Sequence, residues 1–295
     1  MPEYKRITIE DKKELGETLF REPNRGCEYT FGNLFIWRDI YDTKIAKVGG
    51  FYLIRFDEEA HAFLFPVGEG DLKAAVDEML RYCQVGKKTF KIIAASKNDC
   101  DSLQALYPNK FNFQLTRDFA EYVYNSEDLI SLAGKKYHAK RNHISHFYNQ
   151  YPNGEFVEIT SENIERVRTM NNLWYKENYD GNRTLGQDEA TAKNAFDYFF
   201  ELGFKGGFLT VDGEVVAFSM GEAINNDVFC VHEEKAEYTF DGAYTVINRE
   251  FAERFCKDYK YINREDDVGD EGLRKAKLSY YPSEITEKYV VTLND

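Results

Sequence analysis

The stretch GGFLTVDGEVVAFSMGEAI, residues 206–224, forms the centre of the second half of the chain. Its two runs of β-branched and aromatic residues predict two strands. Asp212-Gly213 between them is a dipeptide that two-residue hairpin turns prefer, because both positions require a positive φ. The next stretch, DVFCVHEEKAEYTF at residues 227–240, predicts a third strand. The second half is therefore predicted to be organised around a sheet.

Helices are predicted before and after these strands. Ser161 is expected to cap one helix, and Asp188 to open the next. Asp241-Gly242 leads into a third helix, in which apolar residues recur every four positions. A strand, a helix and a final strand follow at residues 260–263, 271–281 and 284–293. This order of elements is typical of an N-acetyltransferase-like (GNAT) fold.

The first half has a similar order of helices and strands, without a residue-level repeat. Strands are predicted within residues 43–68 and 89–96. Between them, Asp71 is expected to cap an amphipathic helix whose apolar residues recur at spacings of three and four. The fold class is therefore predicted to be mixed α/β, with two tandem GNAT-like domains at residues 1–130 and 131–295.

Composition limits the class of protein. The formal net charge of −13 argues against a general nucleic-acid binder, because such proteins depend on cationic contacts with phosphate. No segment approaches the roughly 20 apolar residues that cross a bilayer, and the charged N-terminus does not resemble a signal peptide. The five cysteines are scattered without a CxxC pair. A reduced, cytoplasmic protein is therefore expected.

One local basic patch stands out against this acidic background. GKKYHAKRNHISHF, residues 134–147, contains no acidic residue. On a helical wheel Lys140 and Arg141 share the apolar face with Tyr137 and Ile144. Two interpretations stay open: the cations extend along the edge of the core, or they bind phosphate, carboxylate or RNA backbone. The three histidines of the patch have no carboxylate among them and lie on different faces, so no metal site is predicted.

A second candidate is TFDGAY, residues 239–244, between a strand and a helix. GNAT enzymes hold the pyrophosphate of coenzyme A at this place, where backbone N–H groups and the helix dipole favour anions. Only Gly242 remains of the usual glycine-rich pattern, and the acidic Asp241 stands beside it. A simple helix cap at Asp241 is the alternative.

The third candidate is NREDDVGDEGLRKAKLSYY, residues 263–281, which predicts a strand end, a turn and a helix. Leu273, Ala276 and Tyr280 are predicted to face the core, and Gly272 suggests a close approach to the helix backbone. Acyl transfer requires a base, an acid and stabilisation of an oxyanion. The carboxylates and a neighbouring cationic stripe with a tyrosine can fill these roles: Glu265, Asp266, Arg274, Lys277 and Tyr281. A salt-bridged corner without a function is the alternative.

Three segments resemble the phosphatidylglycerol lysyltransferase C-terminal domain family, including its soluble bacterial members. They are EYTFGNLFIWRDIY at 28–41, YHAKRNHISHF at 137–147 and NREDDVGDEGLRKAKLSYYPSEITEKY at 263–289. The middle segment, followed by EFVEITSENIERV at 155–167, is also similar to the Fem-type peptidoglycan aminoacyltransferases. The resemblance covers nearly the whole chain.

The resemblance implies two tandem GNAT-like domains and transfer of an aminoacyl group from charged tRNA to an amine or hydroxyl acceptor, such as a lipid headgroup. An acyl group from acyl-CoA is the alternative donor, with coenzyme A as a cosubstrate rather than a tightly bound cofactor. Together with this resemblance, the chemistry of the 263–281 segment makes Glu265, Asp266 and Tyr281 the candidate catalytic residues. The candidate substrate- or phosphate-binding residues are Lys140, Arg141, Asn142, Gly242, Arg274 and Lys277. A non-catalytic binding module that keeps the fold remains the other hypothesis.

Overall fold

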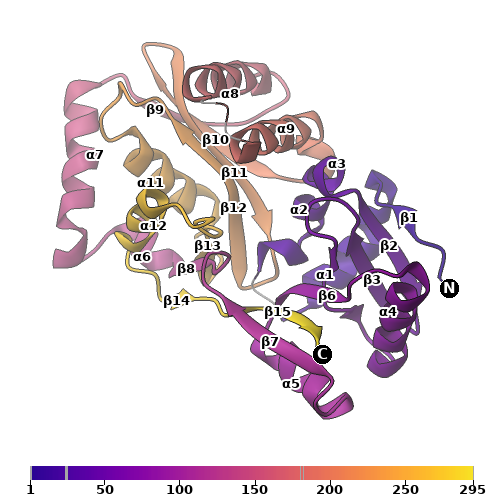
Figure 1. Ribbon diagram of the computed structural model, residues 1–295. Coiled ribbons are helices and arrows are strands. Elements are labelled where there is room, and N and C mark those ends of the chain that lie inside the picture. Colours follow the sequence, from indigo (N-terminus) through magenta and orange to yellow (C-terminus); the bar gives the residue numbers. More distant parts are fainter. Residues whose placement is uncertain (1, 24–25, 180, 182, 295) are drawn as a thin grey trace. The chain divides into compact units, whose positions relative to one another are not determined.

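The computed structural model describes residues 2–23, 26–179, 181 and 183–294. The chain forms two compact units (Figure 1). Unit 1 contains residues 1–121, 266–274 and 285–295, and unit 2 contains residues 122–265 and 275–284. Both units are assembled from separate segments of the chain. The predicted division into domains at residues 1–130 and 131–295 stays a prediction.

Unit 1 contains an eight-stranded sheet in the order β1-β2-β3-β4-β6-β15-β7, with β5 paired to β3. Its strands are β1 Lys5–Arg6, β2 Thr43–Val48, β3 Phe51–Phe56, β4 Ala62–Phe63, β5 Val67–Gly68, β6 Lys91–Ala95, β7 Phe111–Thr116 and β15 Lys288–Leu293. Its α-helices are α1 Glu17–Arg21, α2 Phe31–Ile36, α3 Arg38–Tyr41, α4 Leu72–Gly86 and α5 Lys97–Leu106. The short turns of helix are Ile9–Asp11, Lys12–Gly16 and Cys27–Tyr29.

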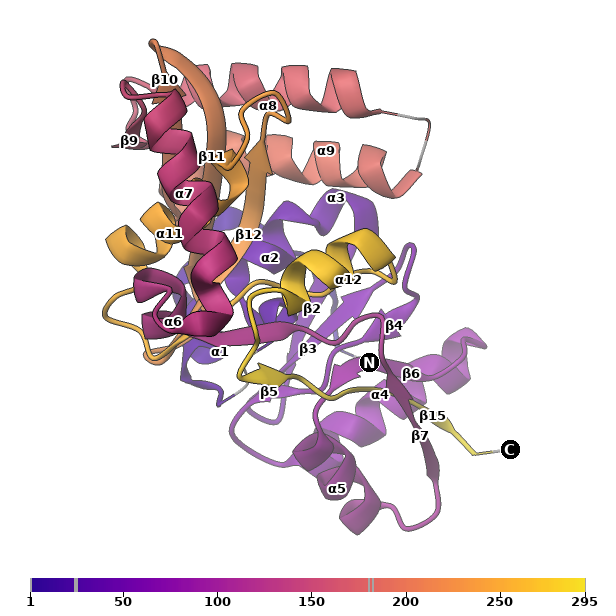
Figure 2. The same cartoon turned by 90° about the vertical axis from the view of Figure 1, so that its left-hand side faces the viewer.

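The C-terminal strand β15 is an internal strand of unit 1. It pairs antiparallel with β6 on one side and with β7 on the other. Val291 of β15 is fully buried in the same apolar cluster as residues of α4 and α5. The last residues of the chain therefore complete the sheet that begins with the first residues, as Figure 2 also shows.

Unit 2 contains a seven-stranded sheet in the order β14-β8-β13-β12-β11-β10-β9. Its strands are β8 Tyr122–Asn125, β9 Glu155–Glu158, β10 Lys205–Val211, β11 Glu214–Ala223, β12 Val228–Ala236, β13 Tyr261–Asn263 and β14 Glu284–Ile285. Its helices are α6 Ser126–Ser131, the turn Lys135–Tyr137, α7 His138–Gln150, α8 Ile164–Asn178, α9 Arg183–Asp197, α10 Phe199–Leu202 and α11 Ala243–Phe255. Helix α12, Glu271–Leu278, begins in unit 1 and ends in unit 2.

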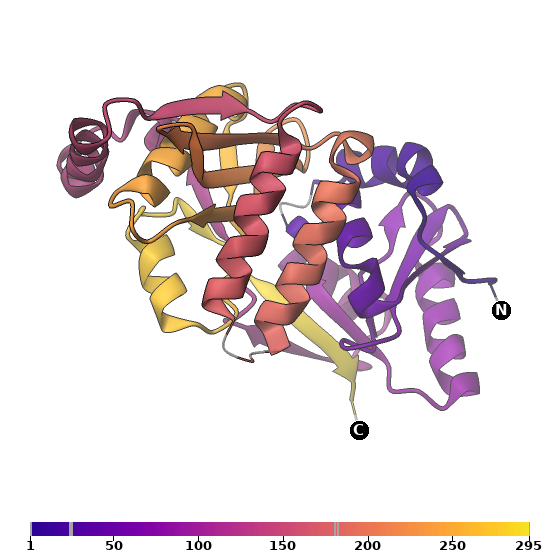
Figure 3. The same cartoon turned by 90° about the horizontal axis from the view of Figure 1, so that it is seen from above.

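Helices cover both faces of the sheet of unit 2 (Figures 1 and 3). On one face, α8 and α9 pack side by side, and Phe196 of α9 contacts Phe218 of β11. On the other face, α11 and α7 bury a cluster that includes Val246 and Phe147. The sheet of unit 2 is therefore the middle layer of three, between the pair α8 and α9 and the pair α7 and α11.

Several sequence-based predictions are confirmed. The hairpin between β10 and β11 turns at Asp212 and Gly213, whose φ angles are 51° and 85°. The carboxylate of Asp71 caps α4 by accepting a hydrogen bond from the backbone N–H of Ala74, at 3.0 Å. Two predicted helix starts are wrong: α8 begins after Asn163 rather than Ser161, and Asp188 lies inside α9.

The predicted core face of α12 is confirmed for Tyr280 and wrong for Leu273 and Ala276, which are exposed. Leu273 is 40% exposed, whereas Lys277 is buried along with Tyr280. The ammonium group of Lys277 donates a hydrogen bond to the backbone carbonyl of Arg264. This bond offsets part of the cost of removing the charge from water, so burial of Lys277 is tolerated. No close backbone approach explains Gly272, since the nearest atom to an added Cβ would be Oδ1 of Asp270, at 3.2 Å.

Candidate active site

Strands β12 and β13 are parallel, and their pairing ends at the carboxyl end of β13, the point that we call the parting of the two strands. Their pairing runs from Val228 and Tyr261 to Cys230 and Asn263, and β12 then continues alone on that side to Ala236. Ligands of α/β sheets commonly bind beyond the carboxyl ends of parallel strands. The parting of β12 and β13 is therefore the first place in unit 2 to look for a site.

A β-bulge lies in β12 at the same level. Glu233 pairs with Met220 and Val231 pairs with Gly221, so His232 is an extra residue without a partner on β11. Gly221 permits this geometry, because a Cβ there would lie 1.9 Å from the carbonyl oxygen of Cys230. The bulge turns the consecutive side chains of His232 and Glu233 to one face of the sheet. It also leaves exposed main chain at His232, whose side chain is only 2% exposed.

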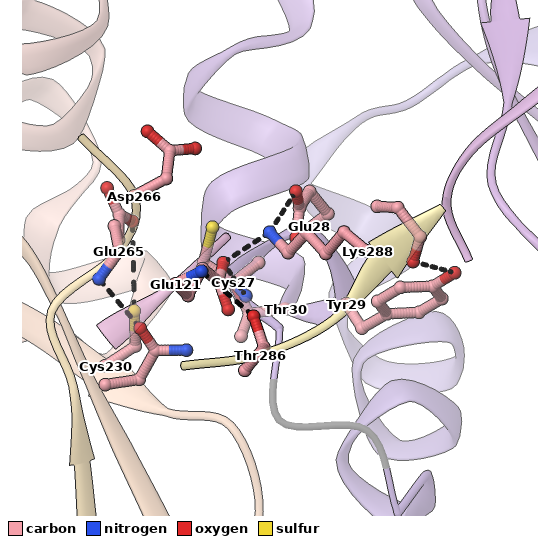
Figure 4. Close-up of polar contacts among 12 residues, drawn as sticks. Cys27, Glu28, Tyr29, Thr30, Glu121, Cys230, Glu265, Asp266, Thr286 and Lys288 are labelled. Atoms are coloured by element: carbon pink, nitrogen blue, oxygen red, sulfur yellow. Dashed lines mark hydrogen bonds and ion pairs between the residues drawn. The ribbon is translucent and has the colours of Figure 1, made fainter. Parts of the chain in front are cut away.

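Four side chains meet at the bulge, and we name them the bulge cluster: Glu222, Cys230, His232 and Glu265. Nδ1 of His232 lies 2.7 Å from Oε1 of Glu265, and Nε2 lies 3.1 Å from Oε1 of Glu222. The thiol of Cys230 lies 3.7 Å from Nδ1 of His232. It lies 3.8 Å from Oε1 of Glu265, as the dashed line between these two residues shows (Figure 4). The side chain of Glu265 is 27% exposed, so the cluster can be reached from solvent.

The geometry favours a doubly protonated His232. An imidazole with a carboxylate at each nitrogen donates from both nitrogens, which only the cation can do. Burial lowers the pKa of His232, but its contacts with Cys230, Glu222 and Glu265 outweigh burial and raise the pKa well above its ordinary value. The cluster can thus hold a proton between two carboxylates, one of which is accessible.

A second polar network lies beside the bulge cluster on the same strand. The ammonium group of Lys235 lies 3.0 Å from Glu233 and 2.9 Å from Asp188 of α9. The hydroxyl of Tyr175 donates a hydrogen bond of 2.5 Å to the same Asp188. Burial raises the pKa of Glu233 to about 7, although Lys235 acts in the opposite direction. This network fixes the start of α9 against the strand that carries His232.

The other face of unit 2 brings the predicted basic patch to the end of α12. The ammonium group of Lys140 donates to the hydroxyl of Ser279 at 2.8 Å and lies 3.6 Å from the ring centre of Tyr280. Arg264 next to this ring pairs with Glu234 at 2.7 Å. Burial, with Arg264 adding to it, lowers the pKa of Lys140 to about 8. The segments 135–146 and 275–281 therefore pack together.

The other predicted phosphate-binding cations also have partners within the protein. Arg141 donates to the carbonyl oxygens of Leu132 and Gly134, which end α6. In unit 1, Arg274 binds Asp267 with two hydrogen bonds of 2.7 and 2.8 Å and Asp118 with one of 2.9 Å. Their binding of an external phosphate stays a prediction, and it would require these contacts to open.

Asn142 and Gly242 lie on or beside α7. The amide of Asn142 lies 3.3 Å from Nδ1 of His138. Gly242 is the N-cap of α11 with φ 87°, and a Cβ there would lie 2.6 Å from the carbonyl oxygen of His143. The close packing of α7 thus explains this glycine without a ligand. Asp241 beside it lies 3.6 Å from His146, a separation at which the pair attract when the histidine is protonated.

The three predicted catalytic residues do not share one environment. Glu265 belongs to the bulge cluster. Asp266 belongs to unit 1, where its carboxylate accepts a hydrogen bond from the backbone N–H of Val268 at 3.1 Å. Tyr281 is 48% exposed, and its ring packs edge-on against that of Tyr137 at 5.6 Å. Of the two that belong to unit 2, Glu265 has the histidine partner of a proton-transfer group, whereas the described contact of Tyr281 is with an aromatic ring.

Unit 1 contains a cluster of similar composition, which we name the Lys288 cluster: Cys27, Glu28, Glu121 and Lys288. The ammonium group of Lys288 lies 2.5 Å from Glu28 and 2.8 Å from Glu121 (Figure 4). The backbone N–H of Cys27 donates to the same Glu121 carboxylate, at 2.9 Å. These contacts attach β15 to the N-terminal part of unit 1.

Sequence reasoning missed most of the bulge cluster, including Glu222, Cys230 and His232. A signal was present: VFCVHEEKA, residues 228–236, places four charged or titratable side chains in succession inside an otherwise apolar strand. Buried polar groups of this kind require partners, and clusters of buried titratable groups are common at functional sites.

Two mixed sheets with this order of helices, in two units of one chain, define a protein of two tandem GNAT-like domains. The chain belongs to the family described as "Phosphatidylglycerol lysyltransferase, C-terminal", whose model matches residues 21–292. The family and the fold together indicate a GNAT-like acyl- or aminoacyltransferase. No helix among the described residues is both long and apolar enough to span a membrane.

Solved structures agree with this fold. A conserved protein of unknown function from Bacteroides thetaiotaomicron VPI-5482 is 40% identical, with full coverage of both chains and a TM-score of 0.96. FemX is 10% identical, with 98% of this chain and 96% of that chain covered and a TM-score of 0.64. L-PGS from Bacillus licheniformis is 16% identical, with 85% and 80% covered and a TM-score of 0.55. At these low identities the last two show the shared fold.

Proposed function

We propose that the chain transfers an aminoacyl group from charged tRNA to an amine or hydroxyl acceptor, and that the chemistry takes place at the bulge cluster. The observation that carries the proposal is the Glu222–His232–Glu265 chain at the parting of two parallel strands. It combines a protonated imidazole, an accessible carboxylate and exposed main chain. The family supports the transferase class, and its printed description supports an aminoacyl group.

Each part of the cluster has a chemical role in this reaction. The acceptor attacks the carbonyl carbon of the aminoacyl ester, and Glu265 takes the proton that the acceptor loses. His232 is buried with a glutamate at each ring nitrogen, so its proton reaches the tRNA 3′-oxygen through the accessible Glu265 carboxylate when the ester C–O bond breaks, and Glu222 holds the imidazole ring in place. The exposed main chain at the bulge lies where N–H groups can stabilise the oxyanion.

The start of α11 favours charged tRNA over acyl-CoA as the donor. A pyrophosphate at this helix start would meet the exposed carboxylate of Asp241, and Gly242 is already required by the packing of α7. Asp241 opposes an anion at a place where the helix dipole alone would favour one, and the packing of α7 explains Gly242 without a bound anion. Acyl-CoA remains the donor to compare in the same assay.

The test is the consumption of aminoacyl-tRNA in the presence of amine and hydroxyl acceptors. Glu265→Gln keeps the size of the side chain and removes the base, so we expect turnover to fall by about 10²–10⁴-fold. Glu69→Gln, on an exposed position of unit 1, is the matched control and should leave turnover unchanged. Turnover by Glu265→Gln at the wild-type rate would refute the assigned base.

Donor choice is tested by binding. Charged tRNA should retard the protein in a gel, with an affinity that falls steeply as salt rises. Coenzyme A should leave the melting temperature unchanged, whereas a true CoA donor site would raise it by mass action. A melting temperature that rises with coenzyme A, and no retardation by tRNA, would reverse the assignment of the donor.

A further inference from the structure

Three atoms of the bulge cluster have the chemistry and spacing of a metal-binding set. They are Sγ of Cys230, Nδ1 of His232 and Oε1 of Glu265, which all lie within 4.8 Å of one another. Sulfur and imidazole nitrogen with one carboxylate are ligands that Zn²⁺ accepts, and three protein ligands leave one position open. No spacing motif in the sequence announces this set, because Glu265 follows His232 by 33 positions.

The separations approach those of a tetrahedral site. Zinc holds sulfur at about 2.3 Å and nitrogen or oxygen at about 2.0–2.2 Å, so that neighbouring ligand atoms lie roughly 3.3–3.6 Å apart. The sulfur of Cys230 lies 3.7 Å from Nδ1 of His232 and 3.8 Å from Oε1 of Glu265. The remaining distance, 2.7 Å between Nδ1 and Oε1, is that of a hydrogen bond. A small rotation of the partly exposed Glu265 side chain would lengthen this distance.

The second nitrogen of His232 has the partner that metal-bound histidines usually have. Its Nε2 lies 3.1 Å from Oε1 of Glu222. A histidine that binds zinc through one nitrogen commonly donates the other N–H to a carboxylate, which fixes the ring and strengthens the ligand. Glu222 thus orients His232 so that Nδ1 points toward Cys230 and Glu265.

The exchange of protons for the ion is electrically balanced. Without an ion, the thiol of Cys230 carries a proton and the imidazolium of His232 carries one on Nδ1, facing Glu265. Binding of one Zn²⁺ releases these two protons to solvent and leaves the charge of the cluster unchanged. The buried strand therefore does not have to accommodate new net charge.

We propose that Cys230, His232 and Glu265 bind one Zn²⁺ ion, oriented by Glu222, with a fourth position open toward solvent. The inference goes beyond the proposed transfer reaction, because it concerns binding alone. With the ion bound, Oε1 of Glu265 and Nδ1 of His232 are ligands, so the ion-bound cluster and the proton-transferring cluster of the proposed reaction are two alternative states of the same residues.

A second group of potential metal ligands lies in unit 1, but its surroundings do not favour a metal ion. Cys27, Glu28 and Glu121 also lie within 4.8 Å of one another. The ammonium group of Lys288 already lies 2.5 and 2.8 Å from the two carboxylates and supplies their counter-charge. A metal ion there would be placed against a buried cation.

The test is Co²⁺ binding to the full chain after treatment with a chelator, followed by displacement with Zn²⁺. We expect one Co²⁺ per chain, a near-ultraviolet charge-transfer band from the thiolate, and the visible bands of tetrahedral cobalt. Cys230→Ser should lose the charge-transfer band, whereas Cys27→Ser should keep it as the matched control. Glu222→Gln should keep the band and bind the ion about 10–100-fold more weakly.

Two results would overturn the inference. One is a wild-type chain that develops no charge-transfer band with Co²⁺, which needs no variant and therefore does not depend on how a variant folds. The other is a band that Cys27→Ser removes and Cys230→Ser retains. Failure here is distinct from failure of the transferase: a chain without metal that still requires Glu265 for turnover loses only the metal site, and a metal-binding chain that transfers nothing loses only the proposed reaction.

Discussion

The bulge cluster and the Lys288 cluster contain the same kinds of groups in different settings. In each, a nitrogen cation lies between two glutamates with a cysteine beside them. In unit 2 the cation is an imidazolium, one carboxylate is 27% exposed, and the strand bulges. In unit 1 the cation is an ammonium group with a 5% exposed side chain, and its strand is paired on both sides.

This difference separates a group that can react from one that holds the fold. Nearby carboxylates raise the pKa of Lys288 well above its ordinary value, against the effect of burial, so its proton is not available for exchange near neutral pH. The pKa of His232 is also raised well above its ordinary value, but that ordinary value is far lower than the one of lysine, and its partner Glu265 is 27% exposed and can exchange a proton with a bound molecule. A charged triad alone does not identify a site, whereas access and a removable proton do.

The largest expected effect is on turnover, from His232→Gln. The amide of glutamine can contact one of the two carboxylates but carries no removable proton, so turnover should fall by about 10²–10⁴-fold. Aminoacyl-tRNA consumption measures this, and the melting temperature reports on folding. His61→Gln, at an exposed position of unit 1, is the matched control. A His232→Gln chain that melts earlier but turns over normally would make the bulge cluster structural, like the Lys288 cluster.

The next effect is on stability, from Lys288→Met. The variant leaves two buried carboxylates without their cation, so we expect the free energy of unfolding to fall by about 3–5 kcal/mol. Urea unfolding followed by circular dichroism measures it. Lys97→Met removes an exposed partner of Asp101 and should leave the free energy of unfolding nearly unchanged. If both variants cost the same small amount, the Lys288 cluster does not hold β15 in the sheet.

Local signals in the sequence were sufficient for much of the fold. The turn at Asp212-Gly213 and the cap at Asp71 each depend on a few neighbouring residues, and both predictions are confirmed. The tandem GNAT-like architecture followed from element order and resemblance. The position of β15 between β6 and β7 could not be predicted in this way, because it depends on pairing between residues that are far apart in the sequence.

The candidate site depended on register, which a single sequence does not specify. Glu265 was singled out, but its partner His232 was not, because the two meet only when β12 and β13 pair in parallel and β12 bulges. Phosphate binding by the predicted cations stays a prediction. Lys140 and Lys277 have the charge that phosphate requires, yet the fold uses both in internal hydrogen bonds.

A smaller effect is expected in the pH dependence of stability. Burial raises the pKa of Glu28 to about 7, so the folded chain holds this proton more tightly than the unfolded chain does. Between the ordinary glutamate pKa and about 7, the folded state binds more protons, and stability should therefore decrease as the pH rises, by roughly 1–3 kcal/mol. Glu28→Gln should remove this contribution, so that the difference between variant and wild type changes over the same window. A constant difference from pH 4 to pH 8, measured by urea unfolding at about one-unit steps, would contradict the raised pKa.

The last comparison is between two glycines within unit 2, one at the bulge and one in a helix, and it contains the smallest expected effect, that of Gly186→Ala. Gly221→Ala would place a Cβ 1.9 Å from the carbonyl oxygen of Cys230, so β11 and β12 must shift, at a cost of about 1–3 kcal/mol. The shift moves His232 away from Glu222, and turnover should fall along with stability. Gly186→Ala in α9 meets only a ring atom of Tyr179 at 3.7 Å, and should instead stabilise the chain by about 0.5–1 kcal/mol with turnover unchanged. If both variants lose stability while Gly221→Ala keeps full activity, the geometry of the bulge is not required for the reaction.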